Sequence, residues 1–260
     1  MKKLIIAVIA LMSMTACATK NVGDVLTISE KNTVILRLPI MSDTASKINE
    51  ELLEKSKKLK KNEPIYLVLD TPGGSIDDGL KIIEVAKSLP RPVHTISLFN
   101  ASMGFIISQY LDDRYVLEST TMMSHRAFIG GMKGEFPGSF ISRFLALGDQ
   151  LTRINSKVAA RAKMSLNPYL DLIRNELWMG PEQAIQLKFA DKQVTLQCDN
   201  SLLGYGEPEE VNLGIFTIKV KFHKCPLVSD PKIVSGNNEV VNDLVHNKVE
   251  FLKKYEIYLK

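Results

Sequence analysis

The chain has 260 residues, of which 45% are hydrophobic and 24% are charged, with a formal net charge of +4 at pH 7. This balance is that of an ordinary globular domain with a core of useful size. Lys2 and Lys3 precede an apolar N-terminal stretch, and without them 31 basic against 29 acidic side chains leave +2. The composition therefore excludes the basic excess typical of a nucleic-acid-binding protein, and no such partner is expected.

The N-terminus predicts an exported protein. Two lysines are followed by the apolar stretch Leu4 to Met12, which is too short to span a bilayer as a stable helix. The letters MTAC that follow resemble a bacterial lipobox, which implies cleavage before Cys17 and lipidation of that cysteine. We expect a signal peptide at 1–17 and a protein anchored on the periplasmic side of the cell envelope, with Ala18 favouring the outer membrane. An ordinary secretory signal is the alternative.

The mature chain alternates strand and helix patterns. Residues 18–32 are polar and suit a tether. Because strands that alternate with helices favour a parallel sheet with right-handed crossovers, we expect an α/β fold. Apolar runs predict five strands, at 33–40, 64–70, 91–99, 114–120 and 121–128. Helical spacing of apolar residues predicts a helix after each of the first three strands. The second of these helices is predicted over 76–89 and the third over 102–113.

The second half of the chain predicts a long helix and a separate extension. Residues 140–164 show no helix break and follow a glycine-rich stretch. After Val194 the pattern changes, with one or two strands predicted within 209–228 and an amphipathic helix within 237–260. We therefore divide the mature chain into a domain at 33–194 and a C-terminal extension at 195–260.

Three short motifs carry candidate chemistry. LDTPGG (69–74) ends a buried strand, and its glycines allow a sharp turn with exposed amide N–H groups that can stabilise an oxyanion. NASMG (100–104) presents Ser102 and the amide of Met103 at a helix N-terminus, although serine also caps helices routinely. MMSHRAF supplies His125 at the end of an apolar run, where it can serve as the base of a serine nucleophile.

In this order and spacing, the three motifs resemble the proteolytic subunit of the Clp protease over residues 33–194. The resemblance implies the Clp protease/crotonase-like fold, a spiral of βαβ units with a parallel sheet and a long handle helix. It also implies a nucleophile, Ser102, and a base, His125. The residues that it implies for the oxyanion hole are Gly74 and Met103, and those for substrate binding are Gly73, Ile76, Phe128 and Ile129.

The resemblance also places a third catalytic residue. The segment WMGPEQAIQLKFAD (178–191) resembles the family segment that follows the catalytic aspartate, and counting back from it places Glu176 at that position. Glutamate can orient an imidazole and stabilise its positive charge. Asn175 and Asp171 remain alternatives.

Two cysteines remain after Cys17. In an oxidising compartment Cys198 and Cys225 are candidates for a disulfide, with two buried free thiols as the alternative. Neither lies in a CxxC metal-binding pattern. No metal or cofactor is expected.

These patterns favour an ATP-independent periplasmic serine peptidase that cleaves peptides or unfolded segments. The resemblance implies a homo-oligomer, but no ATPase partner is expected because ATP is scarce outside the cytoplasm. One alternative is a non-catalytic peptide-binding or assembly lipoprotein on the same fold. Others are a Ser–Lys signal-peptide-peptidase-like enzyme, for which Lys133 and Lys157 are available, and a crotonase-type acyl-CoA enzyme, against which export and the Ser–His pair argue.

Overall fold

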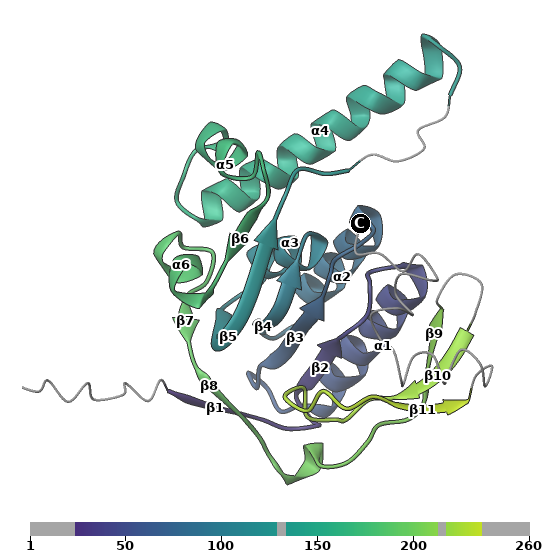
Figure 1. The fold of residues 1–260 in the computed structure, drawn as a ribbon, viewed down its shortest axis with the longest axis vertical. Helices are drawn as coiled ribbons and strands as arrows, with labels where there is room; N and C mark the ends of the chain where they lie inside the picture. Colours follow the sequence, from purple (N-terminus) through teal and green to yellow (C-terminus); the bar gives the residue numbers. More distant parts are fainter. Residues whose placement is uncertain (1–23, 129–133, 213–216, 236–260) are drawn as a thin grey trace, which may run out of the picture.

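A β-sheet forms the centre of the molecule (Figure 1). The structure is a computed structural model and describes residues 24–128, 134–212 and 217–235. Strands β2 to β5 are parallel neighbours in chain order, as the alternation of elements predicts, whereas β6 is antiparallel to β5 and β7 pairs with β5 in parallel. The strands are β2 (Thr33–Leu36), β3 (Ile65–Thr71), β4 (Val93–Ala101), β5 (Arg114–Ser124), β6 (Leu177–Met179) and β7 (Lys192–Gln193).

Helices connect the parallel strands and cover one face of the sheet. This face and its helices enclose an apolar core that includes Leu67, Leu69 and Ile83, while Val68 points into a second core on the opposite face. Burial on both faces explains why β3 is hydrophobic from Ile65 to Leu69. The helices are α1 (Ser42–Lys58), α2 (Ile76–Ser88), α3 (Met103–Tyr110), α4 (Gly138–Arg161), α5 (Leu166–Leu172) and α6 (Pro181–Gln186).

Strand β5 is one continuous element, where the sequence predicted two short strands. The hydroxyl of Thr120 accepts the amide of Leu117 at 2.7 Å and donates to the carbonyl of Ser97 at 2.6 Å. The pairing with β4 shifts register at this point. The side-chain hydroxyl thus replaces ladder hydrogen bonds at a bulge, and the strand continues beyond it to Ser124.

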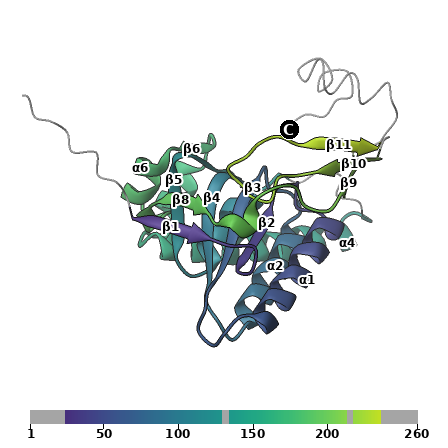
Figure 2. The same cartoon turned by 90° about the horizontal axis from the view of Figure 1, so that it is seen from below.

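The prediction of a tether through residue 32 is wrong for part of that segment. Residues Val25–Ile28 form β1, which pairs in parallel with β8 (Thr195–Cys198). Figure 2 shows the two strands side by side, across the face of the sheet opposite α1 and α2. Because β1 has four residues and a partner about 170 positions away, no local pattern indicates it. The predicted boundary at 194/195 likewise falls just before a strand that packs with the domain, since Leu196 belongs to the core beneath β1.

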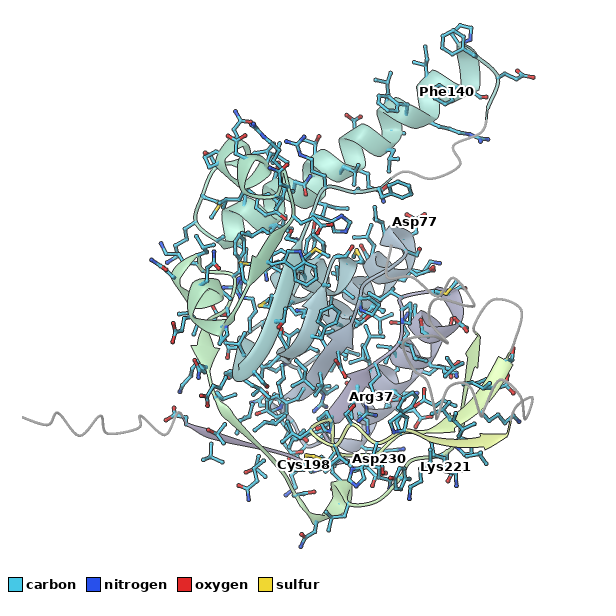
Figure 3. The ribbon with its side chains drawn as sticks, in the orientation of Figure 1. Arg37, Asp77, Phe140, Cys198, Lys221 and Asp230 are labelled. Carbon is cyan, nitrogen blue, oxygen red and sulfur yellow. A yellow bond between two sulfur atoms is a disulfide. The ribbon has the colours of Figure 1, made fainter. Side chains whose placement is uncertain are left out.

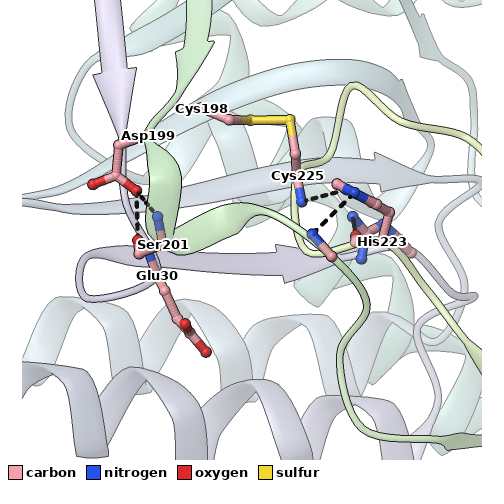
Figure 4. Close-up of a disulfide and its surroundings, with 8 residues drawn as sticks. Glu30, Cys198, Asp199, Ser201, His223 and Cys225 are labelled. Carbon is pink, nitrogen blue, oxygen red and sulfur yellow. Dashed lines mark hydrogen bonds between the residues drawn. A yellow bond between two sulfur atoms is a disulfide. The ribbon is translucent and has the colours of Figure 1, made fainter.

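The C-terminal extension lies against the domain. Its strands form an antiparallel sheet in the order β11-β10-β9, and Cys225 is joined to Cys198 by a disulfide (Figure 4). A guanidinium nitrogen of Arg37, which lies next to β2 (Figure 3), donates to the carbonyl of His223 at 2.6 Å. The strands are β9 (Glu209–Asn212), β10 (Thr217–Lys221) and β11 (Lys232–Ser235).

The long helix α4 projects from the body of the molecule (Figure 1). Its buried residues, Ile154, Val158 and Ala159, all lie in its C-terminal half. Its N-terminal half carries exposed apolar side chains at Ile141, Phe144 and Leu145, and Phe140 lies near the far tip (Figure 3). Within the part of the chain that is described, none of the helices combines the length and the apolarity needed to cross a bilayer.

Some predicted features lie outside the described residues. They are the signal peptide at 1–17 with Cys17, the substrate-binding candidate Ile129, Lys133, and the C-terminal helix within 237–260.

Candidate active site

Ser102 occupies a sharp turn between β4 and α3. Its backbone has φ 55° and ψ −118°, an uncommon conformation for a residue with a side chain and one that costs free energy. The turn is held on both sides, because the amide of Ser102 donates to the carbonyl of Met123 at 2.9 Å and its carbonyl accepts the amide of Ile106 at 3.1 Å. The hydroxyl thus lies at the N-terminus of α3, where the helix dipole favours negative charge.

The Pro-Gly-Gly turn packs directly against Ser102. A Cβ atom on Gly73 would lie 2.6 Å from the Cβ of Ser102 and 2.7 Å from the amide nitrogen of Met103, and its φ is +92°. A Cβ atom on Gly74, whose φ is +147°, would overlap the backbone of Ile40. Both positions therefore require glycine, one to admit the serine turn and the other to admit the segment before α1.

Backbone hydrogen bonds fix the glycine turn in place. The amide of Ile40 donates to the carbonyl of Gly73, and the amide of Ser75 donates to the carbonyl of Ile40, both at 2.8 Å. The amides of Gly74 and Met103, which the sequence predicted as oxyanion donors, have no hydrogen-bond partner among the described residues. Two N–H groups thus remain available in the turns that meet at Ser102.

Thr71 braces the same turn, a function that sequence reasoning did not assign. Its buried hydroxyl donates to the carbonyl of Leu38 at 2.8 Å and accepts the amide of Gly73 at 3.2 Å. The signal in the sequence is a hydroxyl side chain directly before Pro-Gly-Gly, where it can bond to the backbone two residues on.

His125 follows the end of β5 and reaches Ser102. Its Nε2 lies 2.7 Å from the Oγ of Ser102, which is hydrogen-bond distance. If the hydroxyl donates to Nε2, the other ring nitrogen, Nδ1, carries the proton. The structure therefore brings together the two residues that the sequence predicted as nucleophile and base, 23 positions apart.

The predicted third residue, Glu176, makes no hydrogen bond to His125. The last pair between β5 and β6 joins Ser124 to Leu177, so His125 and Glu176 follow it side by side at the same end of the sheet. However, the carboxylate of Glu176 accepts the indole N–H of Trp178 at 3.0 Å. The physical reason is local. Leu177 is buried, Glu176 turns at φ 63° to enter the strand, and the indole two residues on offers a donor.

The alternatives to Glu176 make no hydrogen bond to the histidine either. Asp171 pairs with Arg174 at 2.5 Å, and Asn175 is exposed. Among the described residues, the ring of His125 has a hydrogen bond only to Ser102. Lys157, a candidate base of a Ser–Lys pair, lies instead over the ring of Tyr110, with its amine 4.6 Å from the ring centroid.

The remaining predicted substrate-binding residues lie near this end of the sheet. Ile76 is half-buried at the start of α2 and follows the glycine turn. Phe128, three residues beyond His125, is 87% exposed. Residues 125–128 directly follow β5 and have no strand pairing among the described residues. Backbone without a strand partner next to a nucleophile is able to pair with an extended segment.

The sequence model of the family described as Clp protease matches residues 18–196. The chain is 25% identical to the ATP-dependent Clp protease proteolytic subunit 2 of Treponema pallidum over 173 residues, which is 65% of this chain and 85% of the relative. Identity to the corresponding subunit 2 of Thermobifida fusca is 27% over 169 residues, covering 62% of this chain and 80% of the relative.

A solved structure shares the fold. A point mutant of ClpP1 from Listeria monocytogenes superposes with a TM-score of 0.55 at 19% sequence identity, and the match covers 64% of this chain and 92% of that one. The fold is therefore the Clp protease/crotonase-like α/β fold that the motifs implied. Because the family model spans more than half of the chain, this protein belongs to the Clp protease family.

Proposed function

We propose that this protein is a serine peptidase. The observation that carries the proposal is the 2.7 Å contact between the Oγ of Ser102 and the Nε2 of His125, at a strained turn that opens a helix. A serine hydroxyl is a weak nucleophile until a neighbouring base can take its proton. Membership of the Clp protease family supports the same chemistry.

The proposed reaction follows from the geometry. The Oγ of Ser102 attacks the peptide carbonyl carbon while the Nε2 of His125 takes the hydroxyl proton. The amides of Gly74 and Met103 donate to the oxyanion that forms on the carbonyl oxygen. His125 returns its proton to the leaving amine, and a water molecule, deprotonated by the same nitrogen, then hydrolyses the acyl-enzyme.

Glu176 is our proposed third member, although its carboxylate bonds to Trp178 in this structure. Its place beside His125 at the end of the β5–β6 pairing supports the assignment. To orient the imidazole, the carboxylate must exchange the indole N–H for the Nδ1–H of His125. Removing the carboxylate should therefore weaken the reaction rather than abolish it.

We further propose that the peptidase is exported, lipidated at Cys17 and independent of ATP. The lipobox-like N-terminus supports lipidation. The disulfide between Cys198 and Cys225 supports export, because disulfides persist in oxidising compartments. Without an ATP-driven unfoldase, its substrates are short peptides or unfolded segments. Incorporation of labelled palmitate that is lost in Cys17→Ser tests the anchor, and incorporation by neither protein would exclude it.

A non-catalytic peptide-binding lipoprotein is the second candidate. The observation that favours it is that, among the described residues, no carboxylate is hydrogen-bonded to the ring of His125. On this alternative the site binds extended peptides without cleaving them. Reactivity of Ser102 separates the two candidates, because a binding protein needs no activated hydroxyl.

The first experiment is labelling with a fluorophosphonate probe, using protein that lacks residues 1–17. Labelling of the wild type should vanish in Ser102→Ala and fall at least 1,000-fold in rate in His125→Ala, because the nucleophile and its base are lost. Glu176→Ala should lower the rate about 10-fold, and Asn175→Ala and Asp171→Ala serve as matched controls. A folded wild type that takes no label at neutral pH would exclude the peptidase.

A further inference from the structure

A buried hydrogen bond ties α5 to the strand that carries His125. The hydroxyl of Tyr169 lies 2.8 Å from the hydroxyl of Ser124, the residue directly before the histidine. Both side chains are almost fully buried, at 0% and 1% exposure. Burial raises the pKa of Tyr169 to about 12, so the phenol remains protonated and able to donate at any physiological pH.

The residue on the other side of the histidine is also bound to α5. A guanidinium nitrogen of Arg126 donates to the carbonyl of Leu170 at 3.3 Å. His125 therefore lies between two residues that bond to consecutive positions of one helix. The backbone of Ser124 is fixed from a third direction, because Ser124 pairs with Leu177 of β6.

The ring of Tyr169 connects this arrangement to the nucleophile. It packs against Phe189, with ring centroids 6.0 Å apart, and Phe189 packs edge-on against Phe105 of α3 at 5.2 Å. All three rings are fully buried in one core cluster. Because α3 begins directly after Ser102, the same aromatic cluster supports the helix of the nucleophile and the strand of the base.

We infer that Tyr169 is a positioning residue, which holds His125 at hydrogen-bond distance from Ser102 through its bond to Ser124. The inference rests on the proposed peptidase function for its effect on rate. Proton transfer between a base and a hydroxyl depends steeply on their separation, so a small displacement of the base lowers the rate without changing the affinity for substrate. Tyr169 itself touches no reacting atom.

The test compares Tyr169→Phe, Ser124→Ala and the double variant in fluorophosphonate labelling. Each single variant should lower the maximal rate of labelling about 10-fold, with the half-saturating probe concentration unchanged, because only the base is displaced. The double variant should be no worse than either single variant, since both remove the same bond. Tyr115→Phe, which removes a phenol bonded to Asp113, is the matched control and should label like the wild type.

Thermal melting shows whether each variant folds, and Ser124→Ala remains informative if Tyr169→Phe does not. Folded single variants that label within twofold of the wild type would overturn the inference. A purely structural role would lower the melting temperature and leave the labelling rate of the folded protein unchanged.

A second measurement separates this inference from the proposed function. Nuclear magnetic resonance of protein with ¹³C-labelled histidine rings reports on His125 directly, and His125→Asn assigns its resonance among the four histidines of the chain. Tyr169→Phe should shift that resonance, while Tyr115→Phe should leave it unchanged. This holds even if the wild type takes no label, and an unshifted His125 resonance would overturn the positioning role.

Discussion

At the scale of single residues, the contact between Ser102 and His125 depends on a neighbouring residue without a side chain, Gly73. Gly73 has no side chain, and a Cβ atom added to it would lie only 2.7 Å from the amide nitrogen of Met103. The absence of that atom lets the glycine turn pack against the turn of Ser102. Ser102 in turn adopts a backbone conformation that costs free energy. The strain is retained because the surrounding backbone bonds, such as that from Ser102 to Met123, hold the turn.

This predicts a sharp effect of the smallest substitution at the glycine. Gly73→Ala should lower fluorophosphonate labelling at least 100-fold, because the methyl group would overlap Ser102 and φ is +92°. Gly148→Ala is the matched control, since an added Cβ there meets nothing within 4 Å on helix α4. The control should label normally and melt at the same temperature or slightly higher. Normal labelling of Gly73→Ala would contradict the role of the close approach.

At the scale of elements, the sequence predicts what local patterns encode. The alternation of apolar runs and helical spacing predicts β2 to β5 and the helices between them, and the motifs predict the turn at Gly74, the helix start at Ser102 and the position of His125. Contacts between distant segments have no such pattern. The pairing of β1 with β8 and the bond from Ser124 to Tyr169 join segments that lie far apart in the chain.

The proposed third catalytic residue, Glu176, shows that sequence patterns also fail to predict some contacts between neighbouring residues. Counting along the motif places Glu176 at the position of the family's catalytic aspartate, and in the structure it follows the last pair between β5 and β6, Ser124 with Leu177. The direction of its carboxylate, however, depends on a competition between two donors, the indole of Trp178 and the ring of His125. Sequence spacing carries no information about which donor is bound.

A second prediction concerns the ion pair that joins β5 to the loop after α6. Buried Arg114 donates to both carboxylate oxygens of Asp191, at 2.6 and 2.9 Å, and to the side-chain carbonyl of Gln109 at 2.6 Å. Burial acts to raise the pKa of Asp191, but the hydrogen bonds and charge of Arg114 outweigh it and the pKa is lowered. The pair therefore stabilises the fold above the unfolded-state pKa of about 4 and is lost as pH falls through the lower folded value.

Asp191→Asn should lower the free energy of unfolding by about 2 kcal/mol at pH 7, because it leaves a buried guanidinium with a neutral partner. The partial exposure of the carboxylate keeps this loss below that expected for a fully buried pair. The difference from the wild type should shrink below about pH 4 as the native aspartate takes up its proton. Chemical denaturation at pH 7 and pH 3 measures both values. An equal difference at the two pH values would show that the charge of Asp191 contributes nothing.

At the scale of the whole molecule, the projecting helix α4 presents an apolar surface that the other described residues leave exposed. Ile141, Phe144 and Leu145 are 40%, 53% and 60% exposed, on the half of the helix that leaves the body. We propose that a second copy of the chain covers this surface. Exposed apolar side chains clustered on one helix are typical of an interface.

The prediction is that Phe144→Glu combined with Leu145→Glu shifts the protein to a smaller species, because two charges would have to be buried in the interface. Light scattering after size-exclusion chromatography measures the mass. Ser142→Glu, at an exposed polar position of the same helix, should leave the mass unchanged. A wild type that is monomeric at micromolar concentration would exclude an assembly through α4.

The early start of β1 leaves only a short segment of chain between the proposed lipid anchor and the folded domain. With Cys17 as the lipidated residue that we propose, only the six residues 18–23 separate it from Asp24, at the edge of the folded domain. A fully extended chain covers at most about 3.6 Å per residue, so the domain can rise only about 25 Å above its lipid. The peptidase would therefore diffuse only within a thin layer along the bilayer, so that its encounters with substrates would be limited to two dimensions. Peptides released into or from the membrane would meet it at a high local concentration, and freely diffusing ones would meet it seldom.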